Sequence, residues 1–280
     1  MTDDITLGLT LSGGAAFGAA HVGVLQELAE RGIRPGITAG TSSGALVAAA
    51  YAAGFDVHQI ERVARSFRWR DIARWSFAPR LGLLDAGALH DAVHRVFGHD
   101  PLIEALPRRF AAVATDLGAR RTVTIDQGSL STALRATIAV PGLLAPVRRD
   151  GAWLADGGML DNVPVAATRA LGADRVIVVH LHAKWESVRM MRTTGRVADL
   201  ERDPSVVLIQ PEMERMAQWT MADAPRLIAE GRRAAAAALD AAAPFATASP
   251  SHAADVPRHA PHRTPLVAHH PRSRSRAEVR

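Results

Sequence analysis

No cysteine occurs in the 280 residues of the chain. Its absence excludes disulfide bonds, thiolate metal sites and a cysteine nucleophile, and it is compatible with a reducing compartment. Hydrophobic residues make up 48% of the sequence, which is enough to bury the core of one large α/β domain or of two small ones. The chain is therefore expected to be globular.

A long hydrophobic run is also missing. The sequence begins with acidic Asp3 and Asp4 rather than with a positive segment before an apolar one, so no signal peptide is predicted. Residues 39–54 are mostly apolar but consist largely of Ala, Gly, Ser and Thr, which are too weakly hydrophobic to insert into a membrane. We expect a cytoplasmic protein, with peripheral contact at the inner membrane face as an option. Trp69 and Trp75, with arginines around them, are interpreted as either a lipid-facing patch or a partly buried cap.

Positive charge is concentrated in one segment. Residues 244–280 contain six arginines against Asp255 and Glu278, so this tail carries +4 of the net charge of +5. Residues 1–243 are nearly neutral and show no basic stripe, which argues against specific nucleic-acid binding. The tail is rich in Pro, His, Ser and Arg, so we expect it to be disordered. The predicted organisation is one folded domain, 1–243, followed by a disordered basic tail, 244–280.

Strand-like and helix-like segments alternate along the predicted domain. Strands are predicted at residues 5–11, 33–39, 110–115, 122–126, 152–155, 175–181 and 205–210. Helices are predicted in a segment that ends at Gly32 and at residues 43–53, 56–66, 86–97, 130–138, 163–171 and 223–242. Residues 67–84 are expected to be irregular, and Pro141-Gly142 to form a turn. This alternation predicts an α/β fold with a mostly parallel sheet, whose active site lies beyond the carboxyl ends of the strands.

The sequence Gly40-Thr41-Ser42-Ser43-Gly44 lies between a predicted strand and a predicted helix. This is the context of a G-x-S-x-G nucleophile elbow, in which the serine hydroxyl is exposed at the top of a sheet. Gly40 and Gly44 would allow the sharp turn, because a Cβ atom there would collide with the neighbouring strand or helix. The alternative is that the Thr-Ser-Ser run only caps the helix.

A glycine-rich loop, Gly13-Gly14-Ala15-Ala16-Phe17-Gly18, follows the first predicted strand. It does not fit a dinucleotide-binding loop, because alanine stands at position 15 where G-x-G-x-x-G requires glycine. The backbone N–H groups of Gly13, Gly14 and Ala15 would face the open end of the sheet. There they could hold the negative oxygen of a tetrahedral intermediate, as an oxyanion hole does. A plain tight turn is the alternative.

A serine hydroxyl needs a base to act as a nucleophile at neutral pH. Asp156 ends a predicted strand and is followed by Gly157 and Gly158, which would let the backbone approach a neighbour closely. The same Asp-Gly-Gly is typical of an ordinary surface turn. His180 or His182 could complete a Ser–Asp–His triad. The elbow follows only the second strand, however, whereas that of an α/β-hydrolase follows several, so a Ser–Asp dyad fits the chain order better.

Four stretches carry a resemblance when they are taken in order. They read LSGGAAFGAAHVGVL at residues 11–25, GTSSGA at 40–45, AVPGLLAPV at 139–147 and DGGMLDNVPV at 156–165. Together they resemble the bacterial patatin-like phospholipase family. The resemblance implies a three-layer α/β/α sandwich and a hydrolase that cleaves fatty-acyl ester bonds of lipids with a Ser42–Asp156 dyad. It further implies that no metal, cofactor or catalytic histidine takes part. Its motif glycines would be Gly18, Gly40, Gly44, Gly157 and Gly158.

One of these stretches departs from the pattern of the family. The family's loop usually reads Gly-Gly-Gly-x-Arg-Gly, whereas this chain has Ala15 and Phe17 in place of the third glycine and the arginine. An alanine still donates its N–H, provided that the loop does not need a positive φ there. Without the guanidinium we expect a substrate less anionic than a phospholipid, or reduced activity. The alternative function is a catalytically impaired relative that binds lipid or a partner protein.

Overall fold

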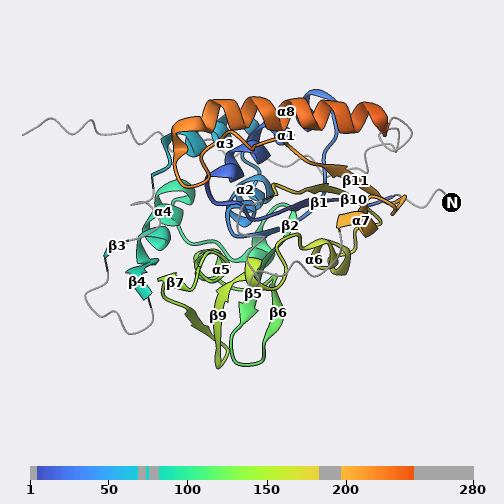
Figure 1. The fold of residues 1–280 in the computed structure, drawn as a ribbon. Coiled ribbons are helices and arrows are strands. Elements are labelled where there is room, and N and C mark those ends of the chain that lie inside the picture. Colours follow the sequence, from blue (N-terminus) through green and yellow to red (C-terminus); the bar gives the residue numbers. More distant parts are fainter. Residues whose placement is uncertain (1–4, 69–73, 76–81, 183–196, 243–280) are drawn as a thin grey trace, which may run out of the picture.

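The computed structural model describes residues 5–68, 74–75, 82–182 and 197–242. The predicted basic tail, 244–280, and the side chains of Trp69 and Trp75 lie outside the described residues. The described part of the chain folds into three layers, with a sheet between two layers of helices (Figure 1). This confirms the predicted α/β/α sandwich.

The main sheet has eight strands in the order β11–β10–β1–β2–β5–β9–β8, with β6 paired to β5 off this path. The strands are β1 (Leu7–Leu11), β2 (Ile37–Thr41), β5 (Arg109–Asp116), β6 (Arg121–Ile125), β8 (Val147–Arg149), β9 (Ala152–Asp156), β10 (Arg175–Val179) and β11 (Val206–Ile209). β11, β10, β1, β2 and β5 are parallel, whereas β6 and β9 run antiparallel to β5, and β8 runs antiparallel to β9. A smaller sheet contains β3 (Arg74–Trp75), β4 (Gly82–Asp85) and β7 (Gly142–Leu144).

β2 and β9 meet end to end along the same edge of β5. Thr41 of β2 pairs with Val113, and Asp156 of β9 pairs with the next residue of β5, Ala114. β6 pairs with residues 112–116 of β5, which include residues that pair with β2 and residues that pair with β9. Because one edge of a strand holds only one partner at a given residue, β6 lies on the opposite edge of β5. Because β2 and β9 run in opposite directions, their carboxyl ends face each other. The turns that follow these two strands are thereby brought together.

Helices cover both faces of the main sheet. They are α1 (Ala19–Glu30), α2 (Ser43–Ala52), α3 (Val57–Ser66), α4 (Gly87–Phe97), α5 (Leu130–Thr137), α6 (Val165–Ala170), α7 (Val197–Leu200) and α8 (Ala224–Ala241), with short 3-10 turns that include η1 (Ala15–Gly18). Alternate strand residues point to opposite faces. Leu9 and Ile177 pack in one core with α1, α2 and α8, whereas Val176 and Val178 pack in another with Val165 of α6. In the described part of the chain, no helix combines the length and the hydropathy that a membrane span requires.

α1 and α8 pack with their backbones in contact (Figure 1). A Cβ atom on Gly23 would lie 1.8 Å from the Ile228 carbonyl oxygen, and one on Gly231 would lie 1.9 Å from the Ala20 carbonyl oxygen. A larger residue at either position would push the helices apart, so the two glycines set how closely α8 lies on α1.

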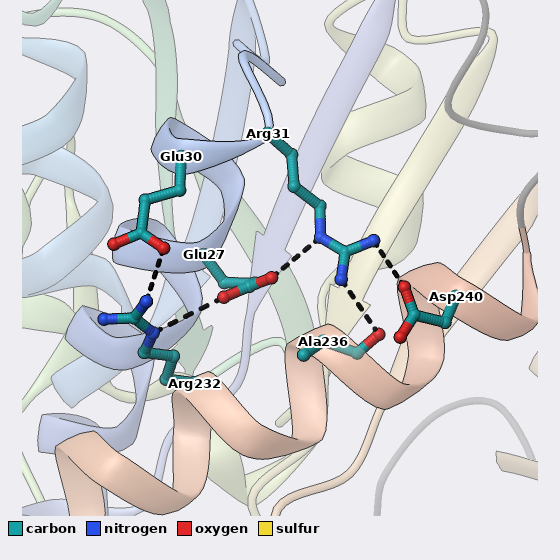
Figure 2. A network of polar contacts seen from close by, with 6 residues as sticks. All are labelled: Glu27, Glu30, Arg31, Arg232, Ala236 and Asp240. Carbon is teal, nitrogen blue, oxygen red and sulfur yellow. Dashed lines mark hydrogen bonds and ion pairs between the residues drawn. The ribbon is translucent and has the colours of Figure 1, made fainter.

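A network of ion pairs extends the contact between α1 and α8 (Figure 2). Glu27 lies 2.7 Å from Arg31 Nε and 3.5 Å from Arg232 Nε. Arg31 also contacts Asp240 at 2.7 Å, and Arg232 contacts Glu30. Glu27 is buried, so water and salt screen its charge less than they screen that of an exposed carboxylate. The network therefore joins the C-terminal end of α1 to α8 through charged side chains.

The predicted helices and strands are confirmed, and the differences concern short elements. β2 begins at Ile37 rather than at residue 33, and it continues through Thr41, so that Ser42 follows it directly. β4 lies in the segment expected to be irregular, and β7 begins at Gly142, where only a turn is predicted. β3, β8 and α7 are likewise not predicted. These elements have only two to four residues, too few to show a periodic pattern.

Candidate active site

Ser42 lies at the turn between β2 and α2, with φ 52° and ψ −124°. A positive φ is strained for a residue with a side chain, and such strain is expected at a nucleophile elbow. The neighbouring glycines permit the tight turn. A Cβ atom on Gly44 would lie 2.3 Å from the Leu11 carbonyl oxygen, and one on Gly40 would lie 2.6 Å from the Ala45 nitrogen.

Thr137, at the end of α5, supports this strained turn. Its Oγ1 accepts a hydrogen bond from the Ser42 N–H at 2.9 Å and donates one to the Val113 carbonyl oxygen. Thr137 is fully buried, so water does not compete for either bond. It is far from Ser42 in the sequence, and no motif indicates this role.

Asp156 is the last residue of β9, and its carboxyl group interacts with Ser42. One carboxylate oxygen, Oδ1, accepts a hydrogen bond from the Gly158 N–H at 2.7 Å, and the Ser42 hydroxyl lies close enough to the carboxyl group to lower its pKa. Gly157 passes so close to β5 that a Cβ atom there would lie 2.3 Å from the Val113 carbonyl oxygen. The structure thus brings together the serine and the aspartate that the sequence analysis pairs.

Burial raises the pKa of Asp156 from its ordinary value of 3.8 to about 6. The residue is only 4% exposed, and loss of hydration disfavours the charged form. The hydrogen bond from Gly158 and the nearby Ser42 hydroxyl lower the pKa and offset part of this effect. A carboxylate with a pKa near 6 is a stronger base than an exposed aspartate, yet it is still mostly ionised at neutral pH.

The loop from Gly13 to Gly18 packs directly on the Ser42 turn. A Cβ atom on Gly13 would lie 3.2 Å from Ser42 Cβ, and one on Gly18 would lie 2.7 Å from Ser43 Cβ. Glycine at these two positions therefore permits the contact. The loop that is predicted to form the oxyanion hole therefore lies beside the Ser42 turn.

The N–H groups of this loop differ in their partners. Gly13 donates to the Asn162 carbonyl oxygen at 3.3 Å, and Gly14 donates to Ser43 Oγ at 3.1 Å. The Ala15 N–H has no acceptor in the described part of the chain, and Ala15 lines the same cavity as the serine. Of the three predicted donors, Ala15 is thus the one that can bind a ligand without giving up another hydrogen bond.

Asn162 joins the loop to the segment that follows Asp156. Its Nδ2 donates to the Gly13 carbonyl oxygen at 3.3 Å, so Asn162 and Gly13 bind each other through two hydrogen bonds. The residue is buried. It belongs to the DGGMLDNVPV stretch, but the motif alone does not predict which partner its side chain meets.

The two departures from the family's loop pattern occupy different environments. Ala15 has φ 52°, so the loop does need a positive φ there, and the alanine bears strain that a glycine would avoid. Phe17 is 1% exposed and packs in the hydrophobic core. Its side chain does not line the cavity beside the serine.

An apolar cavity of about 140 Å³ opens beside Ser42. Its lining residues are Ala15, Ala16, Gly18, Ala19, Ser42, Ser43, Leu46, Val47, Ala50, Ile60, Val63, Ala64, Phe67, Ile138, Val140, Leu143, Leu144, Trp219 and Met221. Within the described residues, this lining includes no charged side chain. Such a cavity suits a hydrocarbon group, and Ser42 would be the polar residue in contact with the ester attached to that group.

The histidines considered for a triad do not line this cavity. His180 and His182 follow β10, which β1 separates from β2, and their ring centroids lie 4.0 Å apart. His21 is fully buried, and its Nε2 donates to the Ser12 carbonyl oxygen at 2.8 Å. Burial lowers the pKa of His21 to about 4 against the opposing effect of this hydrogen bond, so the ring is neutral at pH 7.

Comparison with known families agrees with this fold and site. The family model described as patatin-like phospholipase matches residues 9–169, which is more than half of the chain. The chain belongs to the patatin-like phospholipase family, as the resemblance of its motifs predicts.

Relatives include an uncharacterized NTE family protein of Mycobacterium tuberculosis, which is 38% identical over 217 residues. The match covers 71% of this chain and 59% of that protein, so the chain spans little more than half of that relative's length. The lysophospholipase nte1 of Emericella nidulans is 34% identical over 178 residues, which is 62% of this chain and 12% of the fungal protein. The crystal structure of VipD from Legionella pneumophila superposes with a TM-score of 0.55 at 16% identity, over 85% of this chain and 67% of VipD, and shows likeness of fold alone.

Proposed function

We propose that this chain is a serine hydrolase that cleaves fatty-acyl ester bonds of lipids, with Ser42 as nucleophile and Asp156 as base. One observation carries the proposal. The Ser42 hydroxyl lies close enough to the buried Asp156 carboxyl group to lower its pKa, and the serine stands at the wall of an apolar cavity. A nucleophile needs a base within hydrogen-bond reach, and a lipid ester needs an apolar site for its hydrocarbon part. Membership of the family and the name of the fungal relative support this substrate class.

In the proposed acylation step, Ser42 Oγ attacks the ester carbonyl carbon while the Asp156 carboxylate takes its proton. The tetrahedral intermediate collapses, the bond to the alcohol oxygen breaks, and Asp156 gives the proton to the leaving alcohol. In deacylation, water attacks the acyl–serine ester and Asp156 accepts a proton from it. The fatty acid leaves, and the proton returns to Ser42 Oγ.

Backbone N–H groups would stabilise the negative oxygen of each intermediate. The Ala15 N–H is available as it stands, while Gly14 would exchange its bond to Ser43 Oγ for one to the oxyanion. Gly13 would chiefly shape the loop, since its N–H binds Asn162. The N-terminus of α2 starts at the nucleophile, so its partial positive charge adds to this stabilisation.

A neutral ester is the substrate that the lining favours. The described residues of the cavity wall include no arginine or lysine that could bind a phosphate group. We expect a neutral monoacylglycerol to be hydrolysed faster than a phospholipid with the same acyl chain. Clear preference for the phospholipid would count against this part of the proposal.

The test is covalent labelling of the full chain with a fluorophosphonate, together with ester hydrolysis. Ser42→Ala is expected to abolish both, because it removes the attacking oxygen. Ser205→Ala, just before β11 at the opposite end of the sheet, is the matched control and should retain both. Labelling that persists in Ser42→Ala would reject the assignment. A wild-type protein that binds acyl lipid without labelling or turnover would support the impaired, lipid-binding alternative.

A further inference from the structure

The cavity beside Ser42 is a groove between two helices whose lining residues have the same spacing. On α2 the lining residues are Ser43, Leu46, Val47 and Ala50. On α3 and its C-cap they are Ile60, Val63, Ala64 and Phe67. Both sets occupy positions i, i+3, i+4 and i+7, which lie on one face of a helix. Two helix faces therefore form the long walls of the groove.

The groove has a reactive end and a far end. α2 begins at Ser43, next to Ser42, and Ala50 lies about 10 Å further along the helix axis, at a rise of about 1.5 Å per residue. Residues 53–56 form a tight connection to α3, so Ile60 near the start of α3 lies at the Ala50 end. Ile60 is buried and belongs to the main core, which closes the groove there.

We infer that this groove holds one unbranched acyl chain of about eight carbons, an inference that rests on the proposed function. With C–C bonds of about 1.5 Å, a zigzag chain advances about 1.25 Å per bond, so about eight carbons reach from the ester to Ala50. Ala50 and Ala64 have no atoms beyond Cβ and leave the space that the chain occupies. These two residues therefore set the chain length that the site accepts.

The test measures kcat/KM of the full chain for p-nitrophenyl acetate, butyrate, octanoate and palmitate. The wild type should prefer the octanoate. Ala50→Leu should lower kcat/KM for the octanoate at least about tenfold, since added methylenes block the far end, and should leave the acetate within about twofold. If Ala50→Leu does not fold, Ala64→Leu on the facing wall tests in its place whether a larger side chain in the groove lowers kcat/KM for the octanoate. Ala53→Leu is the matched control, because it adds the same side chain just beyond α2 and outside the groove.

Two results would overturn the inference. One is a wild-type preference for the acetate, and the other is an unchanged chain-length profile in folded Ala50→Leu and Ala64→Leu. Fluorophosphonate labelling of Ser42 in the same samples distinguishes a failure of the groove assignment from a failure of the proposed function. Labelled variants with an unchanged profile refute the groove assignment alone, whereas a wild type that is not labelled refutes the proposed function.

Discussion

The buried carboxyl group of Asp156 should set the pH dependence of ester hydrolysis. Its pKa is raised to about 6, and the ionised form that accepts the Ser42 proton is lost as the pH falls through that value. We expect kcat/KM to be constant above about pH 7 and to fall about tenfold per pH unit below about pH 6. A pH profile with a neutral ester checks this. Activity that stays level down to about pH 4.5 would exclude a base with this pKa.

Ala15 offers a second test at the scale of one residue. The alanine holds a φ of 52°, which costs a residue with a side chain about 1–2 kcal/mol, whereas glycine adopts it freely. Part of the gain is lost because glycine is more flexible in the unfolded chain. Ala15→Gly should therefore raise the free energy of unfolding by about 0.5–1 kcal/mol, as measured by urea denaturation.

A control for this change is available in the same loop. Ala16→Gly alters a residue whose φ is not positive, so it should destabilise the protein. If both variants lose stability, the strain assigned to position 15 is absent. The N–H group remains in either variant, so loss of ester hydrolysis in Ala15→Gly would point to a role of the methyl group.

At the scale of elements, three segments converge on the serine turn. β2 and β9 meet on one edge of β5, and the end of α5 places Thr137 Oγ1 between the Val113 carbonyl oxygen of β5 and the Ser42 N–H. Thr137→Val keeps the shape of the side chain but removes the acceptor, which leaves a buried N–H unsatisfied. We expect a loss of about 1–3 kcal/mol in the free energy of unfolding. Hydrolysis should also fall, because the strained turn loses the bond that orients the nucleophile.

The matched control for this variant is Thr124→Val on β6. Thr124 is exposed, and valine suits a strand as well as threonine does, so stability should change by less than about 0.5 kcal/mol. Equal effects of the two substitutions on stability would show that the hydrogen bond to Ser42 contributes little. Loss of stability without loss of hydrolysis in Thr137→Val would separate folding from catalysis.

For the molecule as a whole, local patterns predict the elements but not how they meet. The alternation of strands and helices predicts the three layers, and the motifs predict Ser42 and Asp156 as a pair. That β9 is antiparallel and faces β2 end to end depends on long-range pairing, which no local period encodes. Thr137 and Asn162 are found only once the strands are assembled. The positive φ of Ala15 contradicts its residue type, and only the packed loop reveals it.

Hydrogen exchange of the full chain should reveal how stability is distributed over this fold. β1, β2 and β10 have strands on both edges and nearly complete burial, so their amides should exchange only on global unfolding. β6 shares a ladder of five residue pairs with β5, but in the described part of the chain its other edge is open and most of its residues are not buried. Its amides, and the β5 amides that bond to β6, should therefore exchange faster than those in the ladder between β1 and β2.

The small sheet of β4 and β7 provides the contrasting case. β7 has only three residues and borders the acyl groove through Leu143 and Leu144. Its amides should exchange faster than those of the main sheet, and covalent labelling of Ser42 with a long-chain fluorophosphonate should slow them, because the chain fills the groove. Equal protection of β7 and β1 in the unlabelled protein would show that the small sheet unfolds only with the whole molecule. The wall of the groove would then be as stable as the core that supports the serine.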